Sequence, residues 1–565
     1  MASAIMEFFP RAKLAIGPAI ENGFYYDMEL TKNITTEDLS KIKDRMQELI
    51  KENQKFIGKK VSKIVAKKLF KNSPYKLEII KELPGKTVGT YQNGNFLDLC
   101  RGGHVKNTKE IEPNSFKLTK IAGAYWRGSE KNKMLTRIYG VAFETEKELM
   151  DYLKIQEEAE KRDHRVLGEK LDLFTFSNLV GKGLPLFTER GAAIRRELER
   201  LVVDEEIKRR YKHVSTPELA KVDLYKKSGH YPYYKDSMYP VMKIDDDELI
   251  LRPMACPHHY QLYLAKPRSY RELPYKIAEL AKQFRYEKSG ELTGLIRIRS
   301  FCLADSHIIC DKEHVGQEIN DVLDLIEDMS KIFGLEKNKD YRYRLSLGDR
   351  KDTKKYYKDD KAWNYAENVL RKVLELRRSP FYEAENEAAF YGPKIDIQMK
   401  NFAGKEDTAF TVQYDFVGPK RFELNFVNSK GEKEEAIVIH RSSIGCIERI
   451  MAFLIEKYAG AFPLWLSPIQ VAIIPISEKH GDYGMKIKED LLNVGIRIET
   501  KYENETLGKK IREAEMQKIP YILIIGDKEI ESQSVSIRER GKGDLGQMKL
   551  EKFIERIKGE ISERK

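Results

Sequence analysis

The sequence predicts an α+β protein of several domains. Its 565 residues are enough for about three or four domains, each with a core of its own. In the centre, alternating runs on either side of the segment from Gly290 to Gly294 predict two antiparallel strands joined by a loop. Near the end, strand-like runs (VAIIPI, YILIIG, VSIRE) alternate with amphipathic stretches, which predicts a small α/β domain.

Changes in composition divide the chain. The first part is rich in glycine and aromatic residues, the second is charged and free of proline, and the prolines of FPLWLSP close the large third part. We expect four segments: a small mixed α and β domain at 1–140, a linker helix at 141–170, a central domain at 171–467 and a C-terminal domain at 468–565.

Composition excludes several classes of protein. The chain is 41% hydrophobic and 34% charged, and its net charge of +12, although spread over the whole length, suits a partner rich in phosphate. Five cysteines without a CxxC pair argue against a disulfide framework and favour a reducing cytoplasm. No run approaches the ~18 apolar residues of a membrane span, and the start lacks a signal peptide. We expect a cytoplasmic protein that does not bind membranes.

Three distant residues form a candidate metal site: Cys256 in RPMACPHHYQLY, His307 in RSFCLADSHIIC and His440 in AIVIHRSSIGCIERI. A single buried cysteine or histidine is more often part of a core. One thiolate and two imidazoles, however, fill three positions of a tetrahedral Zn²⁺, which is the count for a catalytic ion with one position open to substrate. We therefore predict one Zn²⁺ per chain.

The segment FRYEKSGELTGLIRIRSFCLADSH surrounds His307 with charge. With period two, one strand face would carry Arg297, Arg299, Phe301, Leu303, Asp305 and His307, and the preceding strand would carry Arg285 and Glu287. Such a face is a poor core. It is either a solvated surface with salt bridges or a site in which guanidinium groups bind phosphate and carboxylate groups while phenylalanine stacks on a purine.

The patterns PMxCPxH, FRxE, RxRxFxxxDxH and HRxxxGxxER resemble the motifs of class II aminoacyl-tRNA synthetases. In this order they are similar to threonyl-tRNA synthetases of the bacterial type, and the likeness extends to DLCRGGH near the start and IPYILIIGDKEIES near the end. The resemblance implies an antiparallel catalytic sheet flanked by helices, an N-terminal α+β editing-type domain and a C-terminal α/β anticodon-binding domain. It also implies the reaction: ATP and L-threonine give threonyl-adenylate and pyrophosphate, and threonine then passes to the 3′ end of tRNA(Thr).

The resemblance assigns roles to single residues. Arg285 would bind the α-phosphate and the threonine carboxylate, and Arg449 would lie over the adenine near the γ-phosphate, with Mg²⁺ sharing the charge. The other ATP-binding residues would be Glu287 at the adenine amino group, Arg297 at the γ-phosphate, Phe301 under the adenine, and Gln413. Asp305 and Tyr391 would bind threonine, and His230 would assist proton removal from the tRNA 2′-hydroxyl.

Zinc would also explain how the amino acid is selected. Threonine brings an amino group and a hydroxyl to the ion, with Asp305 accepting the hydroxyl proton, whereas valine offers no oxygen and should be rejected by about 10⁴ or more. Serine keeps the oxygen and would still be activated. Two departures from the family lie nearby: Leu303 stands where many members have a glutamine that binds the amino acid, and Cys446 replaces a common serine.

The first domain would remove serine that has been attached to tRNA in place of threonine. Its DLCRGGH resembles half of the family's editing pocket, with Lys76, Asp98, Cys100 and His104 as the matching residues. The family's HxxxH half normally stands just before MASAIMEFFP, and this sequence starts at Met1 of that segment. We therefore expect Ser-tRNA to be cleared slowly.

The resemblance further implies that Glu531 and Arg540, expected on neighbouring strands, read anticodon bases, and that the protein is a homodimer with Pro217 at its interface. Two alternatives remain. One is a synthetase-like RNA-binding regulator without catalysis, which the intact set of candidate site residues disfavours. The other is a related class II enzyme for proline or serine, which the zinc trio disfavours.

Overall fold

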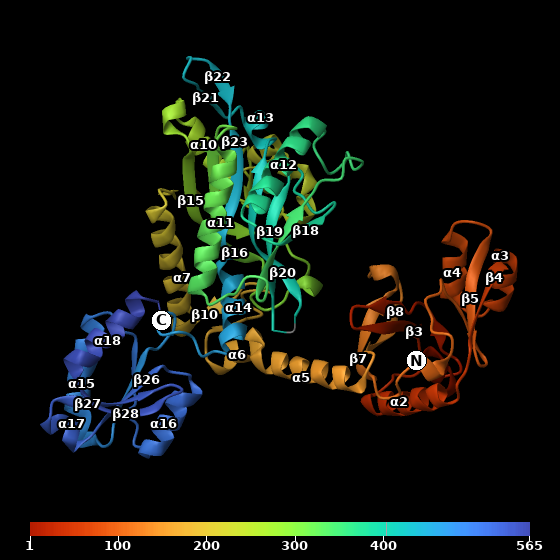
Figure 1. Ribbon diagram of the computed structural model, residues 1–565, viewed down its shortest axis with the longest axis horizontal. Helices are drawn as coiled ribbons and strands as arrows, with labels where there is room; N and C mark the ends of the chain where they lie inside the picture. The colour runs from red at the N-terminus through yellow and green to blue at the C-terminus, as the bar shows by residue number, and fades with distance from the viewer. Residues whose placement is uncertain (403, 565) are drawn as a thin grey trace. The chain divides into compact units, whose positions relative to one another are not determined.

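The structure is a computed structural model that describes residues 1–402 and 404–564. It divides into two compact units, Met1–Glu158 and Ala159–Lys565, which are described separately (Figure 1). None of the helices in the described residues is both long enough and apolar enough to cross a membrane.

The first unit contains two antiparallel sheets. The larger has the order β1 (Lys13–Leu14), β3 (Gly23–Glu29), β8 (Met134–Ala142), β7 (Phe116–Tyr125), with β2 (Ala19–Ile20) also on β3, and it packs against α1 (Ala2–Phe8) and α2 (Thr36–Lys51). The smaller has the order β4 (Phe56–Ser62), β5 (Thr87–Asn93), β6 (Phe96–Leu99), beside α3 (Lys63–Leu69) and α4 (Pro74–Glu82).

The expected single linker helix is in fact two, α5 (Glu146–Arg162) and α6 (His164–Lys170). The break lies at Asp163, whose side chain accepts a hydrogen bond from the Arg165 amide and so caps α6. The buried His164 fixes α6 within the second unit, because its Nδ1 lies 2.7 Å from Oε1 of Glu456 and its Nε2 accepts from the Leu295 amide at 3.1 Å.

The second unit is built on an eight-stranded sheet. Its order is β11 (Lys212–His213), β15 (Tyr275–Phe284), β16 (Ser300–Cys310), β23 (Ile437–Cys446), β20 (Glu406–Asp415), β19 (Lys394–Lys400), β17 (Tyr341–Ser346), β18 (Phe381–Ala384). The sheet is antiparallel except at its two edges, where β11 runs parallel to β15 and β18 parallel to β17. The expectation of an antiparallel catalytic sheet is confirmed.

Strand β16 separates core from cavity by its alternation. Cys302, Ala304, Ile308 and Cys310 belong to the main core, which also contains α11 (Val315–Ile332), α12 (Asp360–Leu376) and α14 (Ile447–Tyr458). Phe301, Leu303, Asp305 and His307 line a cavity on the other face. Successive side chains of a strand point to opposite faces, so a single strand serves both purposes.

Shorter elements complete this domain. They are β9 (Phe174–Thr175), β10 (Leu186–Phe187), α7 (Glu189–Lys208), β12 (Leu219–Lys221), α8 (Val222–Ser228), α9 (His230–Tyr233), β13 (Met242–Ile244), β14 (Asp247–Leu251), α10 (Cys256–Leu264), α13 (Gly418–Phe422), β21 (Asn425–Val427) and β22 (Lys433–Glu435).

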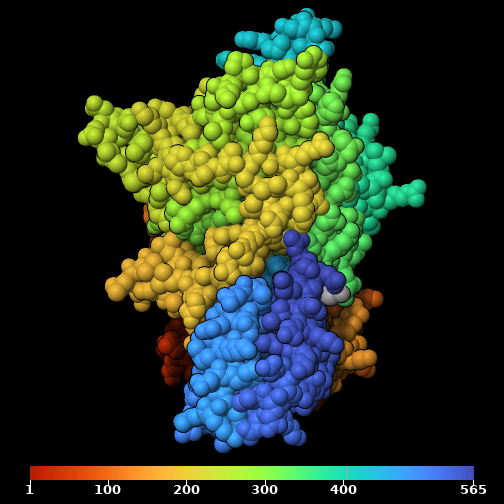
Figure 2. Space-filling view, turned by 90° about the vertical axis from the view of Figure 1, so that its left-hand side faces the viewer, coloured from red at the N-terminus to blue at the C-terminus, as the bar shows by residue number. Residues whose placement is uncertain are grey.

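The C-terminal domain has its own sheet, in the order β25 (Ile498–Thr500), β24 (Val471–Pro475), β26 (Tyr521–Ile525), β27 (Ser534–Glu539), β28 (Gly543–Lys549). Helices α15 (Gly481–Asn493), α16 (Leu507–Met516), α17 (Asp527–Glu531) and α18 (Leu550–Ser562) accompany it. The predicted α/β domain is therefore confirmed. In Figure 2 its blue surface borders the yellow surface of the central domain. Two ion pairs join it to α7: Arg190 lies 2.6 Å from Glu499, and Arg564 lies 2.9 Å from Glu205.

Candidate functional site

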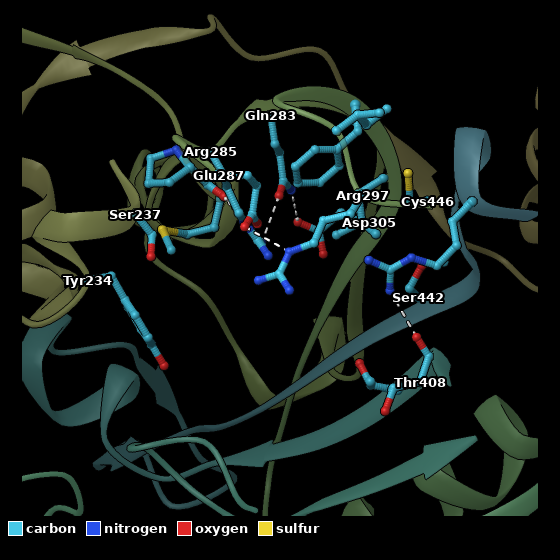
Figure 3. A pocket seen from close by; sticks show the side chains of 18 of the residues that line it. Tyr234, Ser237, Gln283, Arg285, Glu287, Arg297, Asp305, Thr408, Ser442 and Cys446 are labelled. Carbon is cyan, nitrogen blue, oxygen red and sulfur yellow. Dashed lines mark hydrogen bonds and ion pairs between the residues drawn. The ribbon is translucent and has the colours of Figure 1, made fainter. Parts of the chain in front are cut away.

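A cavity of about 660 Å³ opens on the face of the central sheet, beside the strands β15, β16, β20 and β23 (Figure 3). It contains both groups of residues that the sequence singled out. At one end lie Cys256, His307 and His440, and along the rest lie Arg285, Glu287, Arg297, Phe301 and Arg449. Residues from segments almost 200 positions apart therefore line one pocket, as residues 256 and 449 do.

The three candidate metal ligands converge. Their ligand atoms all lie within 4.8 Å of one another, and the residues are 4%, 1% and 6% exposed for Cys256, His307 and His440. The register of the sheet explains two of the positions, because His307 on β16 is directly opposite His440 on β23. Cys256 comes from the first turn of α10.

A chain of hydrogen bonds determines which nitrogen of His307 faces the cluster. Its Nδ1 lies 2.7 Å from Nδ1 of His259, whose Nε2 lies 3.0 Å from Oε2 of Glu279. Although burial opposes it, hydrogen bonds from His259 and Thr216 and the charge of Arg252 lower the pKa of Glu279 to about 2. An ionised carboxylate only accepts, so His259 donates from Nε2 and accepts at Nδ1. Nε2 of His307 therefore carries the free lone pair and is the candidate ligand atom for a metal.

His440 is oriented in the same manner by a carboxylate. Its Nε2 lies 2.8 Å from Oδ2 of Asp415, and the hydroxyl of Tyr260 donates to the same oxygen at 3.1 Å. Oδ1 of Asp415 accepts from the amides of Val417 and Gly418, so the carboxylate itself is held firmly. Nδ1 of His440 is then the nitrogen whose lone pair is available to a metal. Carboxylate–histidine pairs of this kind are typical of metal sites.

The protonation states of His307 and Cys256 fit a bound metal on the condition that the Cys256 thiol loses its proton. Burial and the neighbouring His440 and His259 hold the pKa of His307 well below its usual range, so the imidazole is neutral, as a ligand must be. Burial, Asp305 and Asp415 raise the pKa of the Cys256 thiol. A bound cation would have to displace that proton, because the thiolate is the ligand form. Buried, converging sulfur and nitrogen donors with oriented imidazoles fit Zn²⁺.

Arginine side chains also line the cavity. Arg285 is packed against Phe301, with its guanidinium carbon 5.1 Å from the ring centroid, and it donates from Nε to the Pro253 carbonyl at 3.2 Å. Arg449, in the first turn of α14, donates to the carbonyls of Ile296 and Thr408. Burial and the charge of Arg449 lower the pKa of Arg285. Two half-buried guanidinium groups that repel each other in one cavity favour a polyanionic ligand.

Gly445 allows this arrangement. It has φ of +72°, and a Cβ at this position would lie 2.2 Å from the Ala409 carbonyl oxygen. Only glycine fits there. The chain can therefore pass close to β20 and enter α14 with Arg449 aimed at the cavity.

The structure corrects the expected strand ends. β15 ends at Phe284 and β16 begins at Ser300, so Arg285, Glu287, Arg297 and Arg299 lie in the connection and not on strands. Arg299 does not line the cavity; its Nε donates to the Glu287 carbonyl at 2.9 Å. Arg297 pairs through Nε with Oε2 of Glu287 at 2.9 Å. The two candidate ATP-binding side chains therefore hold each other in this structure.

The remaining catalytic candidates also line the cavity. The hydroxyl of Tyr391 donates to Oε1 of Gln413 at 2.6 Å, and its ring stacks on His440 with centroids 4.9 Å apart. Nδ1 of His230 lies 2.8 Å from Oγ of Ser228, and burial lowers the pKa of His230 to about 3. Asp305 is two residues before His307 on the same face of β16.

Sequence reasoning missed Gln283, Glu279 and Asp415. Gln283 is fully buried, and its Nε2 donates to Oδ2 of Asp305 at 3.1 Å (Figure 3). Gln283 and Asp415 stand at strand ends and Glu279 in the middle of β15, and a polar residue at such a position has no signature in one sequence. Only the pairing of β15, β16 and β20 with their neighbours places them at the site.

The first unit brings its four candidates together. Sγ of Cys100 lies 3.2 Å from Nε2 of His104, whose ring stacks on Phe56 with centroids 4.9 Å apart. Lys76 is buried and pairs with Oδ1 of Asp98 at 2.6 Å. The cysteine and histidine thus form one pair and the lysine and aspartate another.

The two anticodon candidates are not on neighbouring strands. Glu531 is the last residue of helix α17 and is exposed, whereas Arg540 follows β27. The guanidinium of Arg540 donates to the backbone carbonyls of Lys518 and Phe462. The expected strand pairing is therefore wrong, because the GDKEIE segment forms a capped helical turn after β26.

Comparisons with known proteins agree with this architecture. Residues 239–458 match the family described as "tRNA synthetase class II core domain (G, H, P, S and T)". Residues 470–560 match "Anticodon binding domain", and residues 88–139 match "Threonyl and Alanyl tRNA synthetase second additional domain". All three family regions expected from the motifs are present, in the expected order.

Individual relatives are more specific. The chain is 47% identical to a threonine–tRNA ligase of Geobacillus sp. (strain WCH70) over 565 residues, which cover 99% of this chain and 87% of the relative. It is also 47% identical to one of Staphylococcus aureus (strain JH9) over 564 residues, with the same coverage.

Solved structures resemble the chain as well. A crystal structure of the RNA binding domain of threonyl-tRNA synthetase from Cryptosporidium parvum Iowa II is 32% identical, with a TM-score of 0.67, and the match covers 70% of this chain and 98% of that one. A prolyl-tRNA synthetase from Cryptosporidium parvum, 16% identical with a TM-score of 0.52 over 71% of this chain and 75% of that one, shares the fold. The chain therefore belongs to the threonine–tRNA ligase family of class II aminoacyl-tRNA synthetases.

Proposed function

We propose that this protein uses ATP and Mg²⁺ to activate L-threonine as threonyl-adenylate, releases pyrophosphate, and transfers threonine to the 3′ end of tRNA(Thr). One observation carries the proposal. Three converging sulfur and nitrogen donors line the same cavity as Arg285 and Arg449, which supports an amino-acid site and a polyphosphate site in one pocket.

At the amino-acid end, Cys256, His307 and His440 would hold a Zn²⁺. The bound ion would supply a Lewis-acid position for the amino group and hydroxyl of threonine. Asp305, with Oδ1 4.0 Å from Nε2 of His307, is placed to accept the hydroxyl proton in a hydrogen bond. Tyr391, stacked on His440, would close the site above the substrate.

At the phosphate end, Arg285 and Arg449 would neutralise the charge that develops as the threonine carboxylate attacks the α-phosphate and pyrophosphate leaves. Phe301, with Gln413 and Glu287, would bind the rest of the nucleotide. Arg297 would have to leave Glu287, its partner at 2.9 Å, in order to reach a γ-phosphate. Binding of ATP would then exchange one ion pair for another.

His230 would serve the transfer step. Burial keeps its imidazole neutral, with a pKa of about 3, so it is able to accept a hydrogen bond or proton from the tRNA 2′-hydroxyl at any physiological pH. Such a low pKa makes it a weak base. Its main contribution would be to orient the hydroxyl.

Four further assignments follow from family membership. We propose a cytoplasmic homodimer with Pro217 at its interface, and domain boundaries close to residues 140, 170 and 467. Glu531 and Arg540 would contact the anticodon. The Cys100–His104 pair, at 3.2 Å, would belong to an editing-type pocket that clears Ser-tRNA only slowly.

ATP–pyrophosphate exchange with threonine, serine and valine, combined with metal analysis, tests the proposal. We expect about one Zn²⁺ per chain, exchange with threonine, weaker exchange with serine, and a rate with valine lower by about 10⁴ or more. Cys256→Ala, His307→Ala and His440→Ala should each abolish exchange. Active protein without zinc would contradict the metal assignment, and a protein that binds tRNA without exchange would favour the non-catalytic regulator.

A further inference from the structure

Gln283 occupies a special position in the cavity. It is the penultimate residue of β15, it is 0% exposed, and it lies directly opposite Phe301 of β16. Its Nε2 donates to Oδ2 of Asp305 at 3.1 Å, and its Oε1 accepts from Nη2 of Arg285 at 3.4 Å. A glutamine amide both donates and accepts, so it is able to serve a carboxylate and a guanidinium at once.

Asp305 depends on this contact. Among the side chains that the structure describes, Gln283 is the one that hydrogen-bonds its carboxylate. A buried carboxylate without a donor is costly, and its orientation is not fixed. With Oδ2 held by Gln283, Oδ1 is the oxygen turned towards His307, 4.0 Å from its Nε2.

Leu303, the neighbouring residue on the same face of β16, cannot replace the hydrogen bond that Gln283 gives to Asp305. Leu303 precedes Asp305 by two residues on the same face and lines the cavity. The register pairs Leu303 with Ala281, which makes Leu303 and Gln283 diagonal neighbours on one face of the antiparallel pair. Leucine offers no hydrogen bond, so the amide that serves Asp305 comes from the adjacent strand.

We propose that Gln283 is a positioning residue for amino-acid selection. It holds Asp305 so that Oδ1 meets the hydroxyl of the substrate, and it links this carboxylate to Arg285 at the phosphate end. This role rests on the proposed threonine activation. A β-hydroxy amino acid benefits from it, whereas valine, which has no hydroxyl, does not.

The test compares substrates in ATP–pyrophosphate exchange by Gln283→Met, which keeps the length of the side chain and removes the amide. We expect kcat/KM for threonine to fall about 10- to 100-fold, the range for loss of a hydrogen bond to a charged group. The KM for threonine should rise while the KM for ATP stays within about threefold. The residual rate with valine should not change, so the threonine to valine ratio falls by the same factor.

A rescue experiment separates positioning from general damage. Leu303→Gln in the Gln283→Met background places an amide two residues from Asp305 on the same strand face, and it should recover about tenfold in threonine kcat/KM. Gln283→Asn, which keeps an amide but shortens it, should show the same selective loss and replaces Gln283→Met if that variant does not fold.

Gln470→Met is the matched control. Gln470 is also buried, and its amide donates to the Leu464 carbonyl at 3.0 Å and accepts from the Arg497 amide at 3.0 Å, far from the cavity. Gln470→Met should leave the kinetic constants for threonine, valine and ATP unchanged. Equal losses for threonine and valine in Gln283→Met, or an unchanged ratio, would overturn the inference. Absence of threonine-dependent exchange in the unmodified protein would instead refute the proposed function.

Discussion

His307 donates from Nδ1 to Nδ1 of His259, across 2.7 Å, in the interior of the second unit. The bond fixes the tautomer of a candidate metal ligand from behind, and the carboxylate of Glu279 fixes His259 in turn. A ligand imidazole that loses such a partner is free to rotate and is less basic.

We expect His259→Leu to weaken zinc binding by about 10- to 100-fold without abolishing it. Competition with a chromogenic chelator measures this affinity directly and does not depend on enzyme activity. His258→Leu is the matched control, since His258 is also buried but faces Tyr225, at a ring distance of 6.3 Å. Equal zinc affinity in both variants would show that the histidine relay does not support the site.

Arg449→Ala should lose about 3 kcal/mol or more of transition-state stabilisation, which is more than 100-fold in pyrophosphate exchange, because it removes a cation from the developing phosphate charge. Arg285→Ala should behave alike. Arg371→Ala provides the control: this arginine pairs with Glu383 at 2.7 Å and does not line the cavity. Near-normal exchange in Arg449→Ala would remove Arg449 from the proposed site.

Glu531→Gln should raise the KM for tRNA and leave pyrophosphate exchange unchanged, because Glu531 is exposed at the end of α17, in the domain whose sheet is separate from the catalytic sheet. Arg540→Ala should also weaken charging and spare exchange. It should lower the melting temperature as well, since its guanidinium donates to two backbone carbonyls. Equal loss of exchange and charging in either variant would contradict the anticodon assignment.

Cys100→Ala should change the rate of Ser-tRNA deacylation little. An effective general base needs a further group that orients it. Among the described residues no side chain other than Cys100 hydrogen-bonds His104, so we expect the pair to activate water poorly even when it is intact. Burial also lowers the pKa of His104, so its imidazole is uncharged beside the thiol. Incubation of preformed Ser-tRNA with the protein measures the effect. Rapid hydrolysis that is lost in Cys100→Ala would show that this pair suffices.

Much of the fold and the site was predictable because the informative residues lie within single strands, where a local alternation of side chains reveals them. Period two on β16 placed Asp305 and His307 on one face, and the structure confirms that both line the cavity. The strand runs of the C-terminal domain were equally clear. Propensity did not reveal the break between α5 and α6, although Asp163, a good N-cap residue, was a signal that could have been used.

What the sequence could not give are contacts between strands. Gln283 stands in KIAELAKQF directly after Lys282, and Asp415 is the last residue of β20, so nothing in the local sequence sets either residue apart from other polar positions. Their partners, Asp305 and His440, are 22 and 25 positions away. Only the register of the sheet identifies such pairs, and register depends on packing that no local pattern records.

The alternation of β16 restricts how this segment is able to change during evolution. Cys302, Ala304 and Ile308 pack into the core, whereas the odd-numbered residues from Phe301 to His307, Leu303 and Asp305 among them, line the cavity. One inserted or deleted residue would exchange the two sets, burying Asp305 against α11 and α14 and exposing Ile308 to the substrate. Length variation among descendants of this sequence should therefore be confined to the connection at 285–299 and to the loop after Cys310, while single substitutions such as Leu303 remain tolerable.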